Sequence, residues 1–151
     1  MEICDNSCNI LAPLIVKPVN NHDNLLFDHS FFGLLETADL LGIDLAGSAI
    51  TFDAGFDTMM NRTAIQGQGL VPVIKPNRRG IKNRQKLEEL FAIDDEQYEL
   101  YKERYRIERC FAWEDTYRKL VIRYEKLQAT HMGFKELAYS MINLRWFMGK
   151  E

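Results

Sequence analysis

The sequence predicts an α/β fold, and two observations support this class. A buried strand at 49–53 ("AITFD"), a short helix within 57–69 and a second strand at 70–75 follow one another along the chain. Such a βαβ unit implies that the two strands pair in parallel through a right-handed crossover. The 151 residues are 46% hydrophobic, which is enough apolar material for the core of one globular domain.

The segments before this unit predict a hairpin and a covering helix. An aliphatic run interrupted by prolines at 10–19 is typical of a strand, and "MEIC" is interpreted as the end of a preceding hairpin strand. Asp5 is then expected in the turn between them, because Asp is common in turns. Apolar residues near helical spacing predict an amphipathic helix within 20–42 that ends at Gly42.

The segments after this unit predict a loop and two helical regions. Residues 75–86 form a basic loop, and residues 95–126 are expected to be helical with a possible break near 111–113. A C-terminal core helix is expected at about 133–148, with Phe134, Leu137, Ala138, Met141 and Arg145 on or near one stripe that faces the core. Because there is no interdomain linker or repeat, residues 1–151 are expected to form a single domain.

Composition excludes several classes of protein. No apolar run approaches the roughly 20 residues that a membrane span needs, and no secretory signal opens the chain, so a cytoplasmic location is expected. Cys4, Cys8 and Cys110 cannot all pair, and no second CxxC or nearby histidine completes a zinc site. Free thiols are therefore expected.

Charge is segregated along the chain, although the net charge is only −3. Residues 1–60 hold one basic and nine acidic residues, whereas residues 61–90 hold seven basic and two acidic ones. Residues 91–151 balance at eleven of each sign. The basic segment is a candidate contact for nucleic-acid phosphates, with a solvated surface loop as the alternative.

Two carboxylates are candidates for a site. Asp53 ends a strand, where α/β sheets build their binding sites, although a simple turn is the alternative. Tyr101, Arg104 and Glu108 are spaced by three and four, so they share one face of a helix, where Arg104 is expected to orient Glu108. A solvated ion pair is the alternative for that pair.

The chemistry that joins two such acids is metal-dependent phosphodiester cleavage. Two Mg²⁺ ions held about 3.5–4 Å apart need carboxylates that converge from different elements. One Asp and one Glu hold a single ion loosely, because Mg²⁺ keeps several waters, and a two-metal site needs a third carboxylate.

Five stretches together identify a family that the chain resembles, the DDE transposases of bacterial insertion sequences. The chain is similar to their C-terminal part over nearly its whole length, and this resemblance implies a ribonuclease-H-like catalytic fold. The stretches are, in order, "NILAPLIVKPVNNHD", "ITFDAGFD", "LVPVIKPNRRG", "YKERYRIERCFAWED" and "RYEKLQATHMGFKELAYSMINLR".

The resemblance implies a role for each matching residue. Asp53 and Glu108 match catalytic residues that are metal ligands for Mg²⁺ or Mn²⁺. Glu108 lies in a glutamate helix expected at about 95–112, and Tyr101 and Arg104 of the same helix match supporting residues. DNA is the implied partner, at the insertion-sequence ends and the target. The expected DNA-binding residues are Lys75, Arg78, Arg79, Lys82, Arg84, Arg118 and Lys119.

Two departures from the family pattern limit this resemblance. Asp115 stands where the family often has a basic residue, and no residue matches the first catalytic Asp, whose strand is expected to be missing from the sheet. The exposed strand edges that result invite pairing with another chain. The expected partners are therefore a second copy or an upstream part of a split-frame transposase.

The expected function is that of a partial transposase. The family cleaves and transfers DNA strands in DNA transposition with the help of metal ions, and this chain is expected to be inactive alone. Either a truncated remnant or half of a split-frame transposase fits the sequence. The alternative function is a noncatalytic DNA-binding or subunit-interaction fragment that modulates the full-length transposase.

Overall fold

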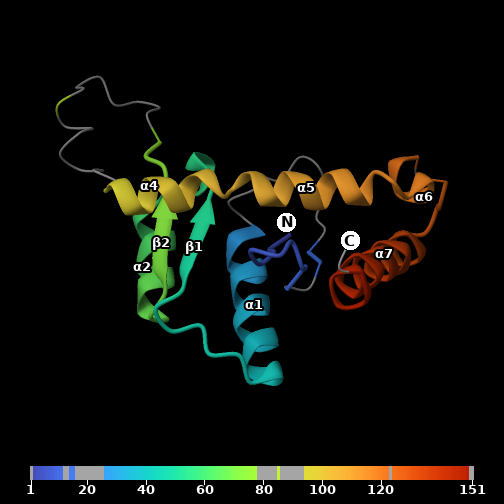
Figure 1. Cartoon of the computed structure of the whole chain (residues 1–151), viewed down its shortest axis with the longest axis horizontal. Helices are drawn as coiled ribbons and strands as arrows, with labels where there is room; N and C mark the ends of the chain where they lie inside the picture. Colours follow the sequence, from blue (N-terminus) through green and yellow to red (C-terminus); the bar gives the residue numbers. More distant parts are fainter. Residues whose placement is uncertain are drawn as a thin grey trace.

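The computed structural model of the chain describes residues 2–11, 14–15, 26–77, 85, 94–122 and 124–149. Within these ranges the structure combines helices with one small sheet (Figure 1). The strands are β1 (Ala49–Phe52) and β2 (Val71–Ile74). The helices are α1 (Phe27–Leu41), the short 3₁₀ helix η2 (Ala54–Phe56), α2 (Met59–Gly67), α4 (Asp95–Lys102), α5 (Tyr105–Glu114), α6 (Arg118–Val121) and α7 (Gln128–Met148).

The predicted βαβ unit is confirmed. β1 and β2 pair in parallel, with Ala49 opposite Val71 and Phe52 opposite Ile74. α2 connects the two strands and packs against β2. Because the pairing is parallel, both strands end at the same edge of the sheet, so the residues that follow them are brought together.

The turn of the predicted N-terminal hairpin is confirmed. Cys4 and Ile10 form an antiparallel bridge, and the Asp5 carboxylate accepts hydrogen bonds from the Ser7 and Asn9 backbone N–H groups, both at 2.8 Å. Asp5 is therefore a turn residue, as expected. Most of the strand expected at 10–19 lies outside the described residues.

The hairpin is fastened to two helices. The Asn143 side chain on α7 donates to the Ile10 carbonyl and accepts from its N–H, at 3.0 and 2.8 Å. On α5, Arg106 donates to the Asn6 carbonyl, and the Cys110 thiol lies 3.4 Å from the Cys8 carbonyl. These contacts hold the hairpin at a fixed distance from the sheet.

Aromatic rings fill the core between α1 and β1. The Phe27 ring centroid lies 5.3 Å from that of Phe31 and 5.4 Å from that of Phe52. Gly42 ends α1 in a left-handed conformation (φ 66°), which confirms the predicted stop. Leu40, near the end of the helix, is 84% exposed because it lies off the buried stripe of Phe31, Leu34 and Ala38.

The helical region after the loop differs from the prediction. The expected break near 111–113 is wrong: the backbone breaks at 103–104 and again at 115–117, so the glutamate helix is divided into α4 and α5. Figure 1 shows these two helices as a nearly straight rod that crosses the carboxyl ends of both strands. α6 lies at the opposite end of this rod from the strands (Figure 1).

The C-terminal helix exists, but its start and its inward face differ from the prediction. α7 begins at Gln128 rather than near 133. Of the expected stripe, Ala138 is buried, but Leu137 and Met141 are 57% and 47% exposed, and Tyr139 and Ile142 are buried instead. The inward face is turned by about one residue because Lys135 and Tyr139 are drawn into polar contacts with α5 and the N-terminal segment.

A half-buried polar cluster joins the N-terminus, α5 and α7. Lys135 lies 3.2 Å from Glu2 and 2.9 Å from Glu114. The Tyr139 hydroxyl contacts both carboxylates, with the Glu114 oxygen at 2.6 Å. Burial and these hydrogen bonds raise the pKa of Tyr139, and the bond with Glu114 and the two negative charges raise the pKa of Lys135 despite its desolvation.

Because of this cluster, the folding stability decreases with rising pH in the alkaline range. Both groups have a higher pKa in the folded state than in the unfolded chain, so their contribution is fully present below pH of about 10 and is lost as the pH rises further. We expect the free energy of unfolding, measured with urea, to fall progressively as the pH rises above about 10. Tyr139→Phe should flatten this fall.

Tyr124→Phe is the matched control, because Tyr124 is 63% exposed. It should leave the alkaline slope unchanged. An equal slope in the native chain and in Tyr139→Phe would contradict the role of the cluster.

Within the described ranges, none of the helices combines the length and apolar character needed to cross a membrane.

Candidate functional site

Asp53 stands at the carboxyl end of β1 with its carboxylate directed away from the turn. Its backbone is extended, and its carbonyl accepts the Phe56 N–H at 2.9 Å, but its side chain makes no capping bond to η2. The carboxylate instead lies 2.8 Å from Nη1 of Arg104, and the Asp53 side chain is 60% exposed. The backbone forms the turn, so the carboxylate is left for another role.

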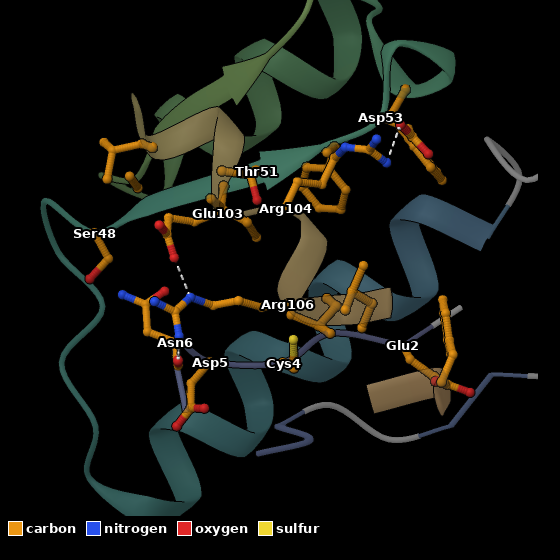
Figure 2. Close-up of a pocket in the computed structure, with 18 of the residues that line it drawn as sticks. Glu2, Cys4, Asp5, Asn6, Ser48, Thr51, Asp53, Glu103, Arg104 and Arg106 are labelled. Carbon is orange, nitrogen blue, oxygen red and sulfur yellow. Dashed lines mark hydrogen bonds and ion pairs between the residues drawn. The ribbon is translucent and has the colours of Figure 1, made fainter. Parts of the chain in front are cut away.

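Three elements bring charged groups together around Tyr101. The Arg104 guanidinium lies 5.6 Å from the centre of the Tyr101 ring, and Nζ of Lys75 lies 5.9 Å from it. Lys75 follows β2 directly, as Asp53 follows β1. We call Asp53, Lys75, Tyr101 and Arg104 the strand-end cluster; Figure 2 shows its ion pair between Asp53 and Arg104.

The predicted partner of Arg104 is wrong. The sequence spacing favoured an ion pair with Glu108, but Arg104 pairs with Asp53 instead. Glu108 is exposed and has no ion pair or hydrogen bond within the described residues. Arg104 precedes α5 and leans toward the strand end, where a carboxylate from another element meets it. Spacing along one helix could not reveal that contact.

The residues present do not form a two-metal site in this arrangement. Across the parts of the chain that the structure describes, no three His, Cys, Asp or Glu side chains converge to hold a metal ion. Asp53 faces a guanidinium, and Glu108 is not drawn into the strand-end cluster. A two-metal clamp needs convergent carboxylates, so two acids alone do not supply the donor set.

Asp57 lies just before α2 but does not cap it. Thr58 caps α2 by accepting the Asn61 N–H at 3.1 Å. The Asp57 carboxylate instead lies 2.7 Å from Nε of Arg62 and accepts the Asn77 N–H at 2.8 Å. Arg62 also donates to the Ile74 carbonyl at 2.8 Å. This clamp fixes the backbone where β2 leads into the basic loop.

The expected DNA-binding residues are separated in the structure. Lys75 belongs to the strand-end cluster. Arg118 and Lys119 are exposed on α6, where Nζ of Lys119 lies 4.3 Å from the centre of the Phe134 ring on α7. The other four, Arg78, Arg79, Lys82 and Arg84, lie outside the described residues.

The cysteines are free, as expected, and two of them are buried. A hydrogen bond with Cys110 lowers the pKa of the Cys4 thiol, although burial opposes this effect. The same bond together with burial raises the pKa of the Cys110 thiol. Cys110 therefore stays protonated and packs as a small apolar side chain.

A cavity of about 600 Å³ opens beside β1, where no sequence pattern indicates one (Figure 2). It lies between β1 and the N-terminal residues 2–6, and Asp53 and Arg104 lie at one end of it. α4 and α5 contribute apolar side chains to its wall. Only the packing of segments far apart in the chain creates this space, which explains why no local pattern predicts it.

Comparison with known proteins identifies the family. The family model described as "Transposase DDE domain" matches residues 3–140. The chain belongs to this family. The family is generally ribonuclease-H-like in fold, acts on DNA and uses divalent metal ions, so membership supports a transposase-like function. No curated protein and no solved structure matches the chain.

The two aspartates of the "DAGFD" stretch should differ in their effect on stability. Asp57 is 5% exposed and bonded to two partners, so Asp57→Asn should lower the free energy of unfolding by about 2–4 kcal/mol. Asp53→Asn is the matched control, because its ion pair is largely exposed and should cost less than about 1 kcal/mol. Urea denaturation of both variants measures the difference, and equal losses would contradict the assigned roles.

Proposed function

We propose that the chain is a catalytic-domain part of a bacterial insertion-sequence transposase that processes DNA at the strand-end cluster. The observation that carries the proposal is the position of Asp53: its carboxylate stands at the carboxyl end of a parallel strand, free of the turn, in a chain of the DDE family. Ligand sites in open α/β sheets lie at that end of the strands.

Each residue of the cluster has a defined task in this proposal. Asp53, with Glu108 from outside the cluster, would ligate a divalent ion once a third carboxylate completes the donor set, and such an ion would activate water. Arg104 holds the Asp53 carboxylate in place, and Tyr101 positions the Arg104 and Lys75 cations on its ring. Lys75 opens the basic loop, whose positive charge attracts DNA phosphates.

The same proposal holds that the isolated chain does not cleave DNA. Asp53 is paired with Arg104, and no three metal-ligating side chains converge within the described residues. Both acids of the hairpin are occupied, Asp5 by the Ser7 and Asn9 N–H groups and Glu2 by Lys135 and Tyr139. A third carboxylate has to complete the donor set. We propose that it comes from a strand outside this chain, in a ribonuclease-H-like sheet.

Cleavage by the isolated chain is the first measurement. With Mg²⁺ or Mn²⁺ and DNA carrying the insertion-sequence terminal repeats, strand cutting on a denaturing gel should not exceed the metal-only background. Asp53→Ala and Asp39→Ala, a change to an exposed acid on α1, should behave identically. Robust cutting that Asp53→Ala abolishes and Asp39→Ala preserves would show that the chain is complete.

The second candidate is a noncatalytic DNA-binding or subunit-interaction fragment that modulates the full-length transposase. The exposed cations of the chain favour it, because Lys75, Arg118 and Lys119 attract phosphates without any metal.

DNA affinity with Mg²⁺ and with a chelator separates the two candidates. Both predict that affinity falls steeply with salt. The transposase proposal expects an additional Mg²⁺-dependent part of the affinity that is lost in Asp53→Ala and in Glu108→Ala. If the chain is a noncatalytic fragment, its DNA affinity should be equal with Mg²⁺ and with the chelator, and neither variant should change it.

A further inference from the structure

The free edge of β1 presents unpaired backbone groups to the cavity. The Val71 N–H donates to the Ser48 carbonyl at 2.9 Å. With the parallel register, this bond turns the backbone groups of Ile50 and Phe52 toward β2 and those of Ala49 and Thr51 toward the opposite side. The N–H and C=O groups of Ala49 and Thr51 have no backbone partner within the described residues.

The opposite wall of the cavity presents a similar open edge at Cys4, whereas the Asn6 carbonyl at one end of this wall is already bonded to Arg106. In the N-terminal hairpin the Ile3 carbonyl accepts the Leu11 N–H, and the Asp5 N–H donates to the Asn9 carbonyl. Ile3 and Asp5 therefore face the hairpin partner, and the backbone of Cys4, which lies between them, faces the cavity. Residues 2–6 line the cavity together with residues 48–53.

The two walls run in opposite directions. In Figure 2, Ser48 and Asn6 lie at one end of the cavity, and Asp53 and Glu2 lie at the other. A strand placed between them pairs in parallel with one wall and antiparallel with the other, and both pairings are common in mixed sheets. The backbone groups on the two sides are thus positioned for one intervening strand.

Apolar side chains form much of the remaining wall of the cavity, and Glu103, Arg104 and Arg106 add charged groups to it. Leu100, Ile107 and Phe111 line it from the α4–α5 rod, and Leu26 and Phe56 line it near α1. Leu100 is 38% exposed and Phe111 is 44% exposed, which is high for such side chains beside a core. A strand with helices over both faces carries aliphatic side chains on both faces.

The outer edge of β2 offers a contrast. By the same register Pro72 and Ile74 face away from β1, and Pro72 has no N–H to donate. The Ile74 carbonyl is already bonded to Arg62. Proline and side-chain capping are ways in which proteins protect sheet edges from pairing. β2 therefore has a protected edge, whereas the edge of β1 that faces the cavity is open.

We propose that this cavity binds an extended, apolar strand of a second polypeptide, which pairs through its backbone with β1 on one side and with residues 2–6 on the other. Matching the four residues of β1 requires about 13 Å of extended chain. Main-chain hydrogen bonds supply the recognition, and the apolar lining selects aliphatic side chains. This inference rests on the proposed function, which takes the third carboxylate from a strand outside this chain. The binding itself involves neither metal nor DNA, so its failure can be distinguished from failure of the proposed function.

A fluorescent peptide, Lys-Lys-Val-Ile-Val-Thr-Val-Lys-Lys, is the probe, and fluorescence anisotropy with the whole chain measures its affinity. The matched control is the same peptide N-methylated at Ile and Thr, which keeps the apolar content and the charge but removes donors on one edge. We expect the methylated peptide to bind at least about tenfold more weakly, because its hydrogen bonds to one wall are lost.

Two variants of the chain locate the binding site. Ala49→Pro removes an N–H that faces the cavity and leaves the bonds to β2 in place, so it should weaken peptide binding with little change in the circular dichroism spectrum. Leu100→Glu places a charge on the lining and should also weaken binding. Leu137→Glu is its matched control, because Leu137 is exposed on α7 and does not line the cavity.

Four results would overturn the proposal. They are equal binding of the two peptides, equal effects of Leu100→Glu and Leu137→Glu, absence of saturable binding, and a dimer of the chain that Leu100→Glu dissociates. The last result would identify a second copy as the occupant. Loss of peptide binding in Leu100→Glu with full binding in Leu137→Glu supports the proposal even where Ala49→Pro does not fold.

Discussion

The parallel pairing of β1 with β2 is the constraint on which the rest of the site depends. Because parallel strands end at one edge, Asp53 and Lys75 are delivered to the same side of the sheet, although they are far apart in sequence. The rod formed by α4 and α5 then crosses that edge and places Tyr101 and Arg104 against both residues. An antiparallel pair would have separated them.

The two edges of this small sheet differ in whether their backbone groups are free to pair. On the side of β2, Pro72 removes a donor, and the clamp formed by Asp57 and Arg62 occupies the Ile74 carbonyl. On the side of β1, unpaired backbone groups face a cavity whose far wall is held by bonds to α5 and α7. The space persists because both of its walls are anchored independently.

Local patterns predicted much of the fold. Alternation and turn residues located both strands, the crossover helix, the hairpin turn at Asp5 and the end of α1 at Gly42, because each of these depends on nearby residues. The predictions failed where inward faces and helix breaks were concerned. Leu137 was expected in the core of α7, but the polar contacts of Lys135 and Tyr139 turn a neighbouring stripe inward.

The sequence by itself determined the family, the βαβ unit and the identity of Asp53 as an acid at a strand end. Only the tertiary structure decided what that acid meets. Arg104 has a carboxylate one helical turn away at Glu108, yet it pairs with Asp53, because packing of the rod across the sheet brings that carboxylate within 2.8 Å. Periodicity describes neighbours along one element, whereas ion pairs and cavities arise between elements, so no local spacing encodes them.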